Sequence, residues 1–384
     1  MNEIVISGTG VFTPKESITN KELVEAYNAY AEKFNTLNKD LIDNGKLDAL
    51  ELSNEDFIYN ASGIKNRYVM DKKGILDPDI MHPILDRRNN DEPSILAEMS
   101  IEAAKQALDV SGKKPSDIDA VITACSNLER AYPAIAIEVQ QYLGIQGFAF
   151  DMNVACSSAT FGIQAAADMI KAGSAETILI VDPEICSGHL DFKDRDCHFI
   201  FGDVCTALIL EKKASANSTN SFEILSTKCI TQFSNNIRNN FGFLNNAKQS
   251  KTLDRDMLFM QEGRKVFKEV VPMVSQLILD HLSDENIEIN DVKRLWLHQA
   301  NKSMNDFIGK KVLGRTPEKN EQPNILQDYA NTSSAGSIIA FSQYSEDMNK
   351  NEIGVLCSFG AGYSAGSVIP VSYTHLTLPT IYSV

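Results

Sequence analysis

The two halves of this chain repeat one rhythm of apolar strand segments and amphipathic helical segments, and this repetition constrains the fold most. Apolar strand segments near the end of each half carry the sequences Phe201-Gly-Asp203 and Phe359-Gly-Ala361. A segment rich in Ser and Asn, 214–221, separates the halves. Strands that alternate with helices predict a layered α/β fold. We therefore predict an internal duplication of a βαβ-type unit in five layers, α/β/α/β/α, with halves at 1–213 and 214–371.

The C-terminal segment 372–384 does not continue this pattern, because it matches neither the strand rhythm nor the helix rhythm of the two halves. We expect it to be a non-native tail of the kind left by cloning. A genuine C-terminal extension is the alternative.

Composition narrows the class of protein. The chain has 384 residues, enough for a large duplicated core, and no apolar run approaches the roughly 18 residues of a membrane span. The N-terminal residues enter a strand directly, without a signal-peptide pattern. Seven cysteines without a Cys-x-x-Cys pair predict a reduced, cytoplasmic setting and no metal site. A net charge of −15 argues against nucleic-acid binding.

Cys156 lies in the segment Asp151–Gly162, between a predicted strand at 147–151 and a predicted helix at 159–172. Free backbone N–H groups and the positive end of the helix dipole favour a thiolate at such a position. A single buried cysteine is nevertheless more often an inert core residue. The functional interpretation of Cys156 therefore depends on the other motifs.

Two further polar residues stand at the ends of predicted elements in the second half. His298 ends an apolar strand, and Asn331 precedes an apolar helix. A single histidine at a strand end is more often a structural residue than a catalyst, and Asn331 alone is as readily a helix N-cap. Together with Cys156 they form a set suited to carbon–carbon bond formation on thioesters, since a thiolate carries the acyl group and two neutral donors stabilise an enolate.

The motifs together resemble those of β-ketoacyl-ACP synthase III, a condensing enzyme of the thiolase superfamily. They are Asp151–Gly162, Phe201–Asp203, His298–Asn301, Asn331–Ser337 and Phe359–Ser367, and they span about residues 1–371 in the family's order. The resemblance implies a thiolase-like fold and a homodimer. It also implies a ping-pong, decarboxylating Claisen condensation of an acyl primer with malonyl-ACP to a 3-oxoacyl-ACP, which initiates fatty-acid synthesis. Acyl-CoA and malonyl-ACP would be substrates, and no cofactor is implied.

The resemblance also implies residue roles. Cys156 would be the acylated nucleophile, while His298 and Asn331 would stabilise the enolate derived from malonyl-ACP. The backbone N–H groups of Cys156 and Ala361 would form the oxyanion hole. Tyr132 matches an aromatic residue that reaches across the dimer to the partner's acyl pocket, or else it is an ordinary interface residue.

Departures from the family pattern leave the acyl donor open between acyl-CoA and acyl-ACP. The Trp and Arg that grip CoA fall on Phe57 and Ala61, and another family Arg falls on Ser303. The chain also carries insertions near 28–52, 70–95 and 235–260. Basic residues around these motifs would form a replacement rim for an acidic carrier protein, unless they are isolated surface charges. These residues are Lys65, Arg67, Lys302, Lys310, Lys311 and Arg315.

Other activities on the same fold would need different residues in these motifs. HMG-CoA synthase would need a glutamate at the end of the strand 118–125, where this chain has Thr-Ala-Cys-Ser-Asn. Head-to-head acyl-CoA condensation would need a glutamate immediately before Pro133, where Tyr132 stands and Glu129 lies three positions away. That activity, a non-decarboxylating acyltransferase and a catalytically silent partner subunit remain alternatives.

Overall fold

The structure, a computed structural model, describes residues 3–218, 220–247 and 254–374. Its centre is a sheet with the strand order β11-β12-β13-β8-β1-β7-β6-β4-β5. The strands from the first half of the chain are β1 (Ile4–Phe12), β4 (Ala120–Ala124), β5 (Phe148–Met152), β6 (Thr177–Ile185) and β7 (Asp203–Lys212). Those from the second half are β8 (Asn220–Ser234), β11 (Val292–Leu297), β12 (Ile353–Gly360) and β13 (Gly362–Thr374).

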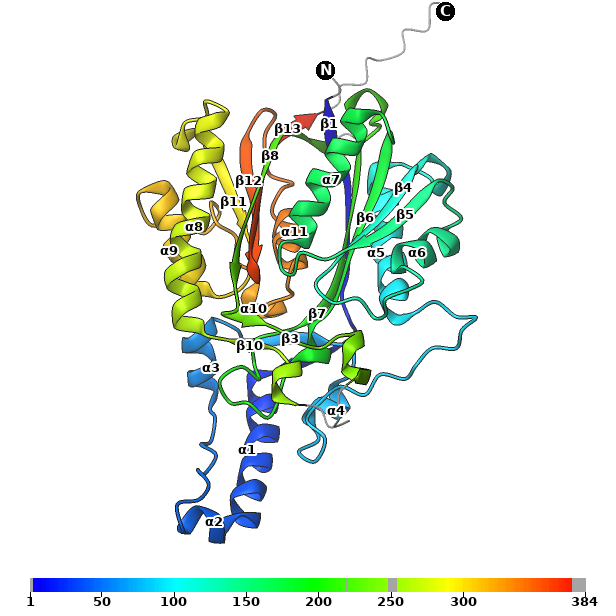
Figure 1. The fold of residues 1–384 in the computed structure, drawn as a ribbon. Coiled ribbons are helices and arrows are strands. Elements are labelled where there is room, and N and C mark those ends of the chain that lie inside the picture. The colour runs from blue at the N-terminus through cyan, green and yellow to red at the C-terminus, as the bar shows by residue number, and fades with distance from the viewer. Residues whose placement is uncertain (1–2, 219, 248–253, 375–384) are drawn as a thin grey trace, which may run out of the picture.

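The sheet consists of two half-sheets that are joined at one end only. Strand β1 pairs with β8 at Val5↔Glu223 and Ile6↔Phe222, whereas β1 pairs with β7 along nearly its whole length. Away from this junction the half-sheets separate, and helices α7 (Ser158–Ala172) and α11 (Ala335–Gln343) fill the space between them (Figure 1). One core cluster accordingly contains residues of both helices and of both half-sheets.

Outer helices cover the other face of each half-sheet. Helices α5 (Ile95–Ser111) and α6 (Ile135–Leu143) cover the first, and α8 (Gly263–Asp284) and α9 (Lys302–Leu313) cover the second. With layers on both faces, strands such as β4 are buried along their whole length. The predicted α/β/α/β/α arrangement is therefore confirmed.

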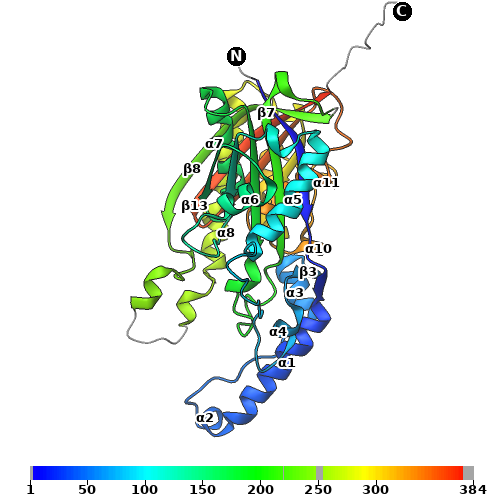
Figure 2. The same cartoon turned by 90° about the vertical axis from the view of Figure 1, so that its right-hand side faces the viewer.

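The smaller elements form a cap at the end of the layers away from the β1–β8 junction. Strands β2 (Glu16–Thr19) and β3 (Asn66–Val69) pair with each other, as do β9 (Ile237–Arg238) and β10 (Met260–Gln261). The helices of the cap are α1 (Asn20–Leu37), α2 (Lys39–Asp43), α3 (Glu55–Ser62), α4 (Lys72–Leu76) and α10 (Leu326–Tyr329). Figures 1 and 2 both show α1 and α2 projecting away from the body, so this insertion forms an arm.

Strand β13 continues to Thr374 and pairs there with the start of β8, with Ser372 opposite Phe222 and Tyr373 opposite Ser221. Residues 372–374 thus belong to the sheet, which extends beyond the predicted boundary at 371. The short-range pattern could not show this, because the strand is completed by a partner 150 positions away in the chain. Residues 375–384 lie outside the described residues. Within the described part of the chain, no helix combines the length and the apolar character that crossing a bilayer requires.

Candidate active site

Cys156 lies on a tight turn between strand β5 and helix α7. Ala155, immediately before it, has φ 48°, a left-handed conformation that costs a residue with a Cβ roughly 1–3 kcal/mol. Asn153 holds this turn, because its Oδ1 accepts a hydrogen bond from the Ala155 N–H (2.9 Å). Strand β12 approaches so closely that a Cβ on Gly360 would lie 2.5 Å from the Cβ of Cys156. Cys156 is therefore fixed by backbone from both halves of the chain.

Burial raises the pKa of the Cys156 thiol to about 11. Two contacts act in the opposite direction, a hydrogen bond from Ser333 Oγ to Cys156 Sγ (3.4 Å) and one from the backbone of Ala361. The expected preference for a thiolate at the helix start is thus opposed by desolvation, which favours the neutral thiol. Desolvation of the charged sulfur outweighs these favourable contacts at this depth.

His298 follows the end of β11 and is 2% exposed. Its backbone N–H donates to the Cys357 carbonyl (2.8 Å), and its ring packs edge-on against Phe359. Burial lowers the pKa of His298 to about 3, although a hydrogen bond with the Ser333 backbone acts to raise it. The imidazole is thus neutral at pH 7, and its Nδ1 has no hydrogen-bond partner within the described residues.

Asn331 is held by the Phe201 motif of the other half. It forms a parallel bridge with Phe201, in which its N–H donates to the Ile200 carbonyl (3.0 Å) and its carbonyl accepts from the Gly202 N–H (3.1 Å). The Asn331 Oδ1 accepts a hydrogen bond from the Ser333 N–H (2.9 Å). The side-chain amide oxygen is thereby occupied, which leaves the amide N–H groups as donors.

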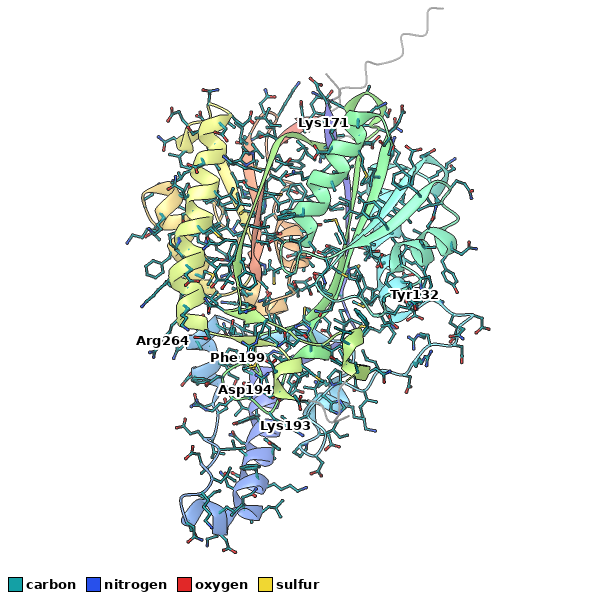
Figure 3. All side chains as sticks on the ribbon, in the orientation of Figure 1. Tyr132, Lys171, Lys193, Asp194, Phe199 and Arg264 are labelled. Atoms are coloured by element: carbon teal, nitrogen blue, oxygen red, sulfur yellow. The ribbon has the colours of Figure 1, made fainter. Side chains whose placement is uncertain are left out.

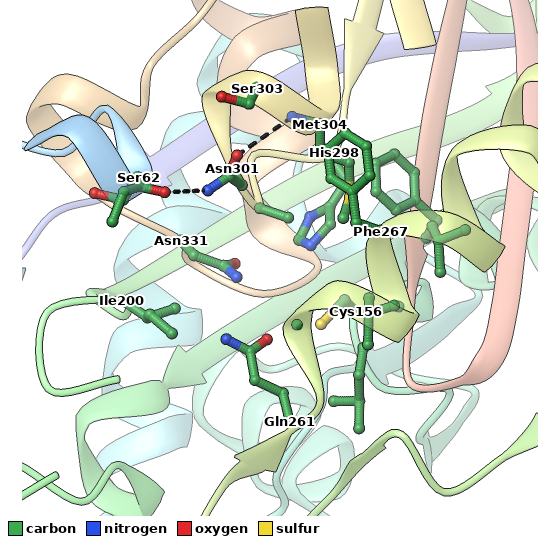
Figure 4. Close-up of a pocket in the computed structure, with 18 of the residues that line it drawn as sticks. Ser62, Cys156, Ile200, Gln261, Phe267, His298, Asn301, Ser303, Met304 and Asn331 are labelled. Atoms are coloured by element: carbon green, nitrogen blue, oxygen red, sulfur yellow. Dashed lines mark hydrogen bonds between the residues drawn. The ribbon is translucent and has the colours of Figure 1, made fainter. Parts of the chain in front are cut away.

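Cys156, His298 and Asn331 line one pocket of about 560 Å³, and Figure 4 shows the three side chains around it. Most of the walls are apolar, with contributions from Phe199, Phe201, Ile237, Phe259, Phe267 and Val270. Ile237 and Phe259 belong to the insertion near 235–260, which therefore forms part of the pocket. Among the described residues no group of three His, Cys, Asp or Glu side chains is arranged to hold a metal ion.

The basic residues expected at the rim lie at different places in the structure. Lys302 and Lys310 line a second hollow beside α9, while Lys311 and the Glu321-paired Arg315 are exposed. Lys65 is also exposed and lies over the ring of Tyr59.

The prediction that Arg67 belongs to the basic rim is wrong, because its side chain is fully buried. Alternate residues of β3 point inward, and the Arg67 guanidinium donates to the Ile18 carbonyl and to Asn20 Oδ1 (2.6 Å). The basic residues that do line the pocket are Arg264 and Lys268, at the start of α8. Sequence reasoning missed both, although the segment Gly263-Arg-Lys-Val at a helix start was a visible signal.

Tyr132 lies elsewhere and is 84% exposed (Figure 3). It precedes helix α6, and other exposed apolar side chains, Ile137, Tyr142 and Phe148, follow on α6 and the edge strand β5. In the single chain Tyr132 is not among the described residues that line the pocket.

Comparison with known proteins identifies the family. The sequence model of 3-oxoacyl-[acyl-carrier-protein (ACP)] synthase III matches residues 150–232, and that of its C-terminal part matches residues 282–370. A β-ketodecanoyl-[acyl-carrier-protein] synthase of Pseudomonas aeruginosa is 59% identical over 346 residues, which cover 90% of this chain and 99% of the relative. The chain belongs to the 3-oxoacyl-ACP synthase III family. It is therefore a condensing enzyme, an acyltransferase of fatty-acid synthesis.

Solved structures agree with the fold. The 3-oxoacyl-ACP synthase III of Aquifex aeolicus superposes with a TM-score of 0.74 at 22% identity, covering 96% of this chain and 99% of that one. The synthase III of Pseudomonas aeruginosa gives 0.73 at 21% identity, covering 98% and 100%. OleA of Xanthomonas campestris gives 0.71 at 14% identity, covering 96% and 99%. At these identities the likeness shows the fold alone, and it confirms the predicted thiolase-like architecture.

Proposed function

We propose that this enzyme forms a 3-oxoacyl-ACP by decarboxylating condensation of an acyl primer with malonyl-ACP, through a ping-pong mechanism on Cys156, His298 and Asn331. The observation that supports this most is the shared pocket. A thiol, a neutral imidazole and a carboxamide come from distant parts of the chain and line the same cavity. Family membership gives the reaction class, and these three side chains suit its two half-reactions.

In the first half-reaction the Cys156 sulfur attacks the carbonyl carbon of the primer thioester. The carbonyl oxygen takes up negative charge and receives hydrogen bonds from the backbone N–H groups of Cys156 and Ala361. The bond from the carbonyl carbon to the donor sulfur then breaks. The proton of the Cys156 thiol leaves with the donor thiol, so that acyl-Cys156 and a free thiol result.

In the second half-reaction malonyl-ACP loses CO₂, and the electron pair of the broken bond forms an enolate. His298 and Asn331 donate hydrogen bonds to the enolate oxygen. Because burial holds the pKa of His298 near 3, the neutral ring stabilises this charge without an acidic proton that would quench the carbanion. The carbanion attacks the acyl carbonyl, the bond from that carbon to sulfur breaks, and the departing Cys156 thiolate takes up a proton from solvent.

We propose a medium-chain primer. The relative at 59% identity is named for a β-ketodecanoyl product, which has ten acyl carbons. A condensation that adds two carbons makes this product from an eight-carbon primer. The apolar walls of the pocket suit such a chain. The proposal covers donors bound to CoA and to ACP, since the sequence departs from the family at the CoA-gripping positions Phe57 and Ala61.

We further propose a homodimer that forms along strand β5. This strand is the edge of the sheet, and Phe148 on it is 41% exposed. An unpaired edge strand with apolar neighbours is a template for pairing with a second copy. In such a dimer Tyr132 would reach the partner's acyl pocket. The carrier protein, which is acidic, would dock near the basic residues Arg264 and Lys268 at the pocket.

The proposal is tested by supplying malonyl-ACP with acetyl-CoA, octanoyl-CoA or octanoyl-ACP and identifying the product by mass spectrometry. We expect 3-oxodecanoyl-ACP from at least one octanoyl donor, faster than 3-oxobutanoyl-ACP from acetyl-CoA. Preference for acetyl-CoA would overturn the medium-chain assignment. Absence of any 3-oxoacyl-ACP would overturn the condensation itself.

A further inference from the structure

Two carboxyl groups, Asp182 and Glu184, lie buried behind the pocket. They are 2% and 0% exposed, and they occupy alternate positions of β6, so that both side chains leave the same face of the strand. Neither is among the described residues that line the pocket. Within the described part of the chain, neither forms an ion pair with Lys or Arg. Buried carboxyl groups without a cation need hydrogen-bond donors or a proton.

Glu184 receives several donors. Its Oε1 accepts from the Ser126 N–H (3.0 Å) and from Ser334 N–H (3.4 Å) and Oγ (3.0 Å), and its Oε2 accepts from Ser126 Oγ. Asp182 has fewer donors, because no backbone N–H in the described residues donates to it and only the side chains of Ser334 and Thr206 do so. Its Oδ1 contacts Ser334 Oγ at 2.6 Å.

The geometry favours a proton held on this carboxyl pair. Ser334 Oγ carries one hydrogen but lies within hydrogen-bonding distance of both carboxyl groups. Each contact has a hydrogen of its own only if one carboxyl group is protonated and donates to the serine oxygen; otherwise the two carboxyl groups share the single serine hydrogen. Burial raises the pKa of both groups, and that of Asp182 lies well above its ordinary value. Because Glu184 has the better donors, the proton belongs on Asp182.

This pair connects the two strained turns of the active site. On one side, the Ser126 carbonyl accepts from Asn153 Nδ2 (2.7 Å), and Asn153 holds the turn before Cys156. On the other side, Ser334 follows Ser333, whose φ of 50° is left-handed. Such conformations persist only where the surroundings enforce them.

Ser333 in turn touches the reacting groups. Its N–H orients the side chain of Asn331, and its hydroxyl donates to Cys156 Sγ. A shift of the turn 331–334 would therefore move an enolate donor and a contact of the nucleophile together.

We propose that Asp182 and Glu184 are positioning residues, a singly protonated carboxyl pair that holds the turn 331–334 and thereby orients Asn331 and Ser333. This inference rests on the proposed function, because it assigns Asn331 to the condensation step. Neither residue touches the substrate. The pair acts through Ser334, and a neutral side chain at position 182 is what the arrangement needs.

The experiment compares Asp182→Asn with Asp182→Ala in the full-length enzyme, and measures the half-reactions separately. Acylation of Cys156 by octanoyl-CoA is followed by intact-mass spectrometry, and condensation by mixing the acylated enzyme with malonyl-ACP. Asparagine resembles a protonated carboxyl group in shape and neutrality. The rates of acylation and of condensation by Asp182→Asn should therefore both stay within twofold of the wild-type rates. Asp182→Ala should lower condensation at least tenfold and acylation no more than threefold.

Two further variants keep the outcome decisive. Ser334→Ala removes the bridging hydroxyl and leaves both buried carboxyl groups in place. It should reproduce the selective loss of condensation even if Asp182→Ala does not fold. Glu211→Gln alters a buried carboxyl that pairs with Lys113 instead, and it should leave the ratio of the two half-reactions unchanged. Asp182→Asn behaving like Asp182→Ala, or equal losses in both half-reactions, would overturn the proposal.

A readout that does not require condensation separates the two proposals. If wild type acylates Cys156 but condenses nothing, the proposed function fails, and the turn is then judged by alkylation of Cys156 with iodoacetamide. Loss of the Ser333 contact removes a stabiliser of the thiolate, so Asp182→Ala and Ser334→Ala should slow alkylation at least twofold, and Asp182→Asn should not. Equal rates in all four proteins would contradict the positioning role.

Discussion

Replacing Gly360 with alanine is a direct way to disturb Cys156, the proposed nucleophile, without changing its side chain. The new Cβ would lie 2.5 Å from the Cβ of Cys156, 3.0 Å from its Sγ and 3.2 Å from its backbone nitrogen. Contacts of Cβ atoms under about 3 Å do not persist, so the Cys156 turn and strand β12 must move apart by several tenths of an ångström. Neither side yields easily, since β12 is paired on both edges and Ala155 already holds a strained conformation.

The magnitude follows from these contacts. Overpacking of this kind costs roughly 1–3 kcal/mol of stability, and a displacement approaching 1 Å at a reacting atom costs about a hundredfold in rate. We therefore expect Gly360→Ala to lower the rate of Cys156 acylation between tenfold and a hundredfold. Urea denaturation should show a free energy of unfolding lower by 1–3 kcal/mol. Single-turnover acylation by octanoyl-CoA, followed by intact mass, measures the first effect.

Gly242→Ala is the matched control, because nothing lies within 4 Å of a Cβ built at Gly242 and its φ is not left-handed. It should acylate at the wild-type rate. If the Gly360→Ala variant is acylated at the wild-type rate, the reasoning is refuted, because the close approach of β12 then does not fix Cys156.

Further outcomes follow from the site and the cap. Alkylation of Cys156 by iodoacetamide should accelerate continuously from pH 7 to 10, because the raised pKa keeps the thiol protonated there; a plateau below pH 9 would contradict it. His298→Ala should slow condensation by about 2.7–4 kcal/mol in the barrier and acylation far less, and equal loss in both half-reactions would count against its role. Arg67→Met should lower the free energy of unfolding by roughly 1–3 kcal/mol, because two buried acceptors lose their donor, whereas Lys65→Met should change it by less than about 0.5 kcal/mol; equal effects would place Arg67 at the surface.

Much of the fold followed from the sequence because its signals are local. The alternation of strand and helix segments and the repeated Phe-Gly sequences predicted a layered α/β fold, and the structure confirms this layered arrangement. Cys156, His298 and Asn331 were visible as polar residues at the ends of apolar segments. They meet in one pocket because the two halves of the chain pack against each other, an arrangement that a duplicated fold implies.

What the sequence did not predict depends on burial and on long-range partners. Arg67 reads as a surface charge until the pairing of β3 with β2 turns it inward. The raised pKa of the Cys156 thiol results from desolvation in the fold, which the neighbouring sequence does not reveal. The carboxyl pair had a signal, since Asp182 and Glu184 interrupt the apolar strand Thr177–Ile185, but their link to Ser334 spans about 150 positions.

The central claim is that Cys156 carries the acyl group between the two half-reactions, and one measurement tests it most directly. The enzyme is incubated with octanoyl-CoA and, in parallel, octanoyl-ACP, digested and mapped by mass spectrometry, before and after addition of malonyl-ACP. We expect one octanoyl group on Cys156, which disappears on addition of malonyl-ACP as 3-oxodecanoyl-ACP forms. An unmodified Cys156 with every donor, or an adduct that malonyl-ACP does not discharge, would contradict the mechanism.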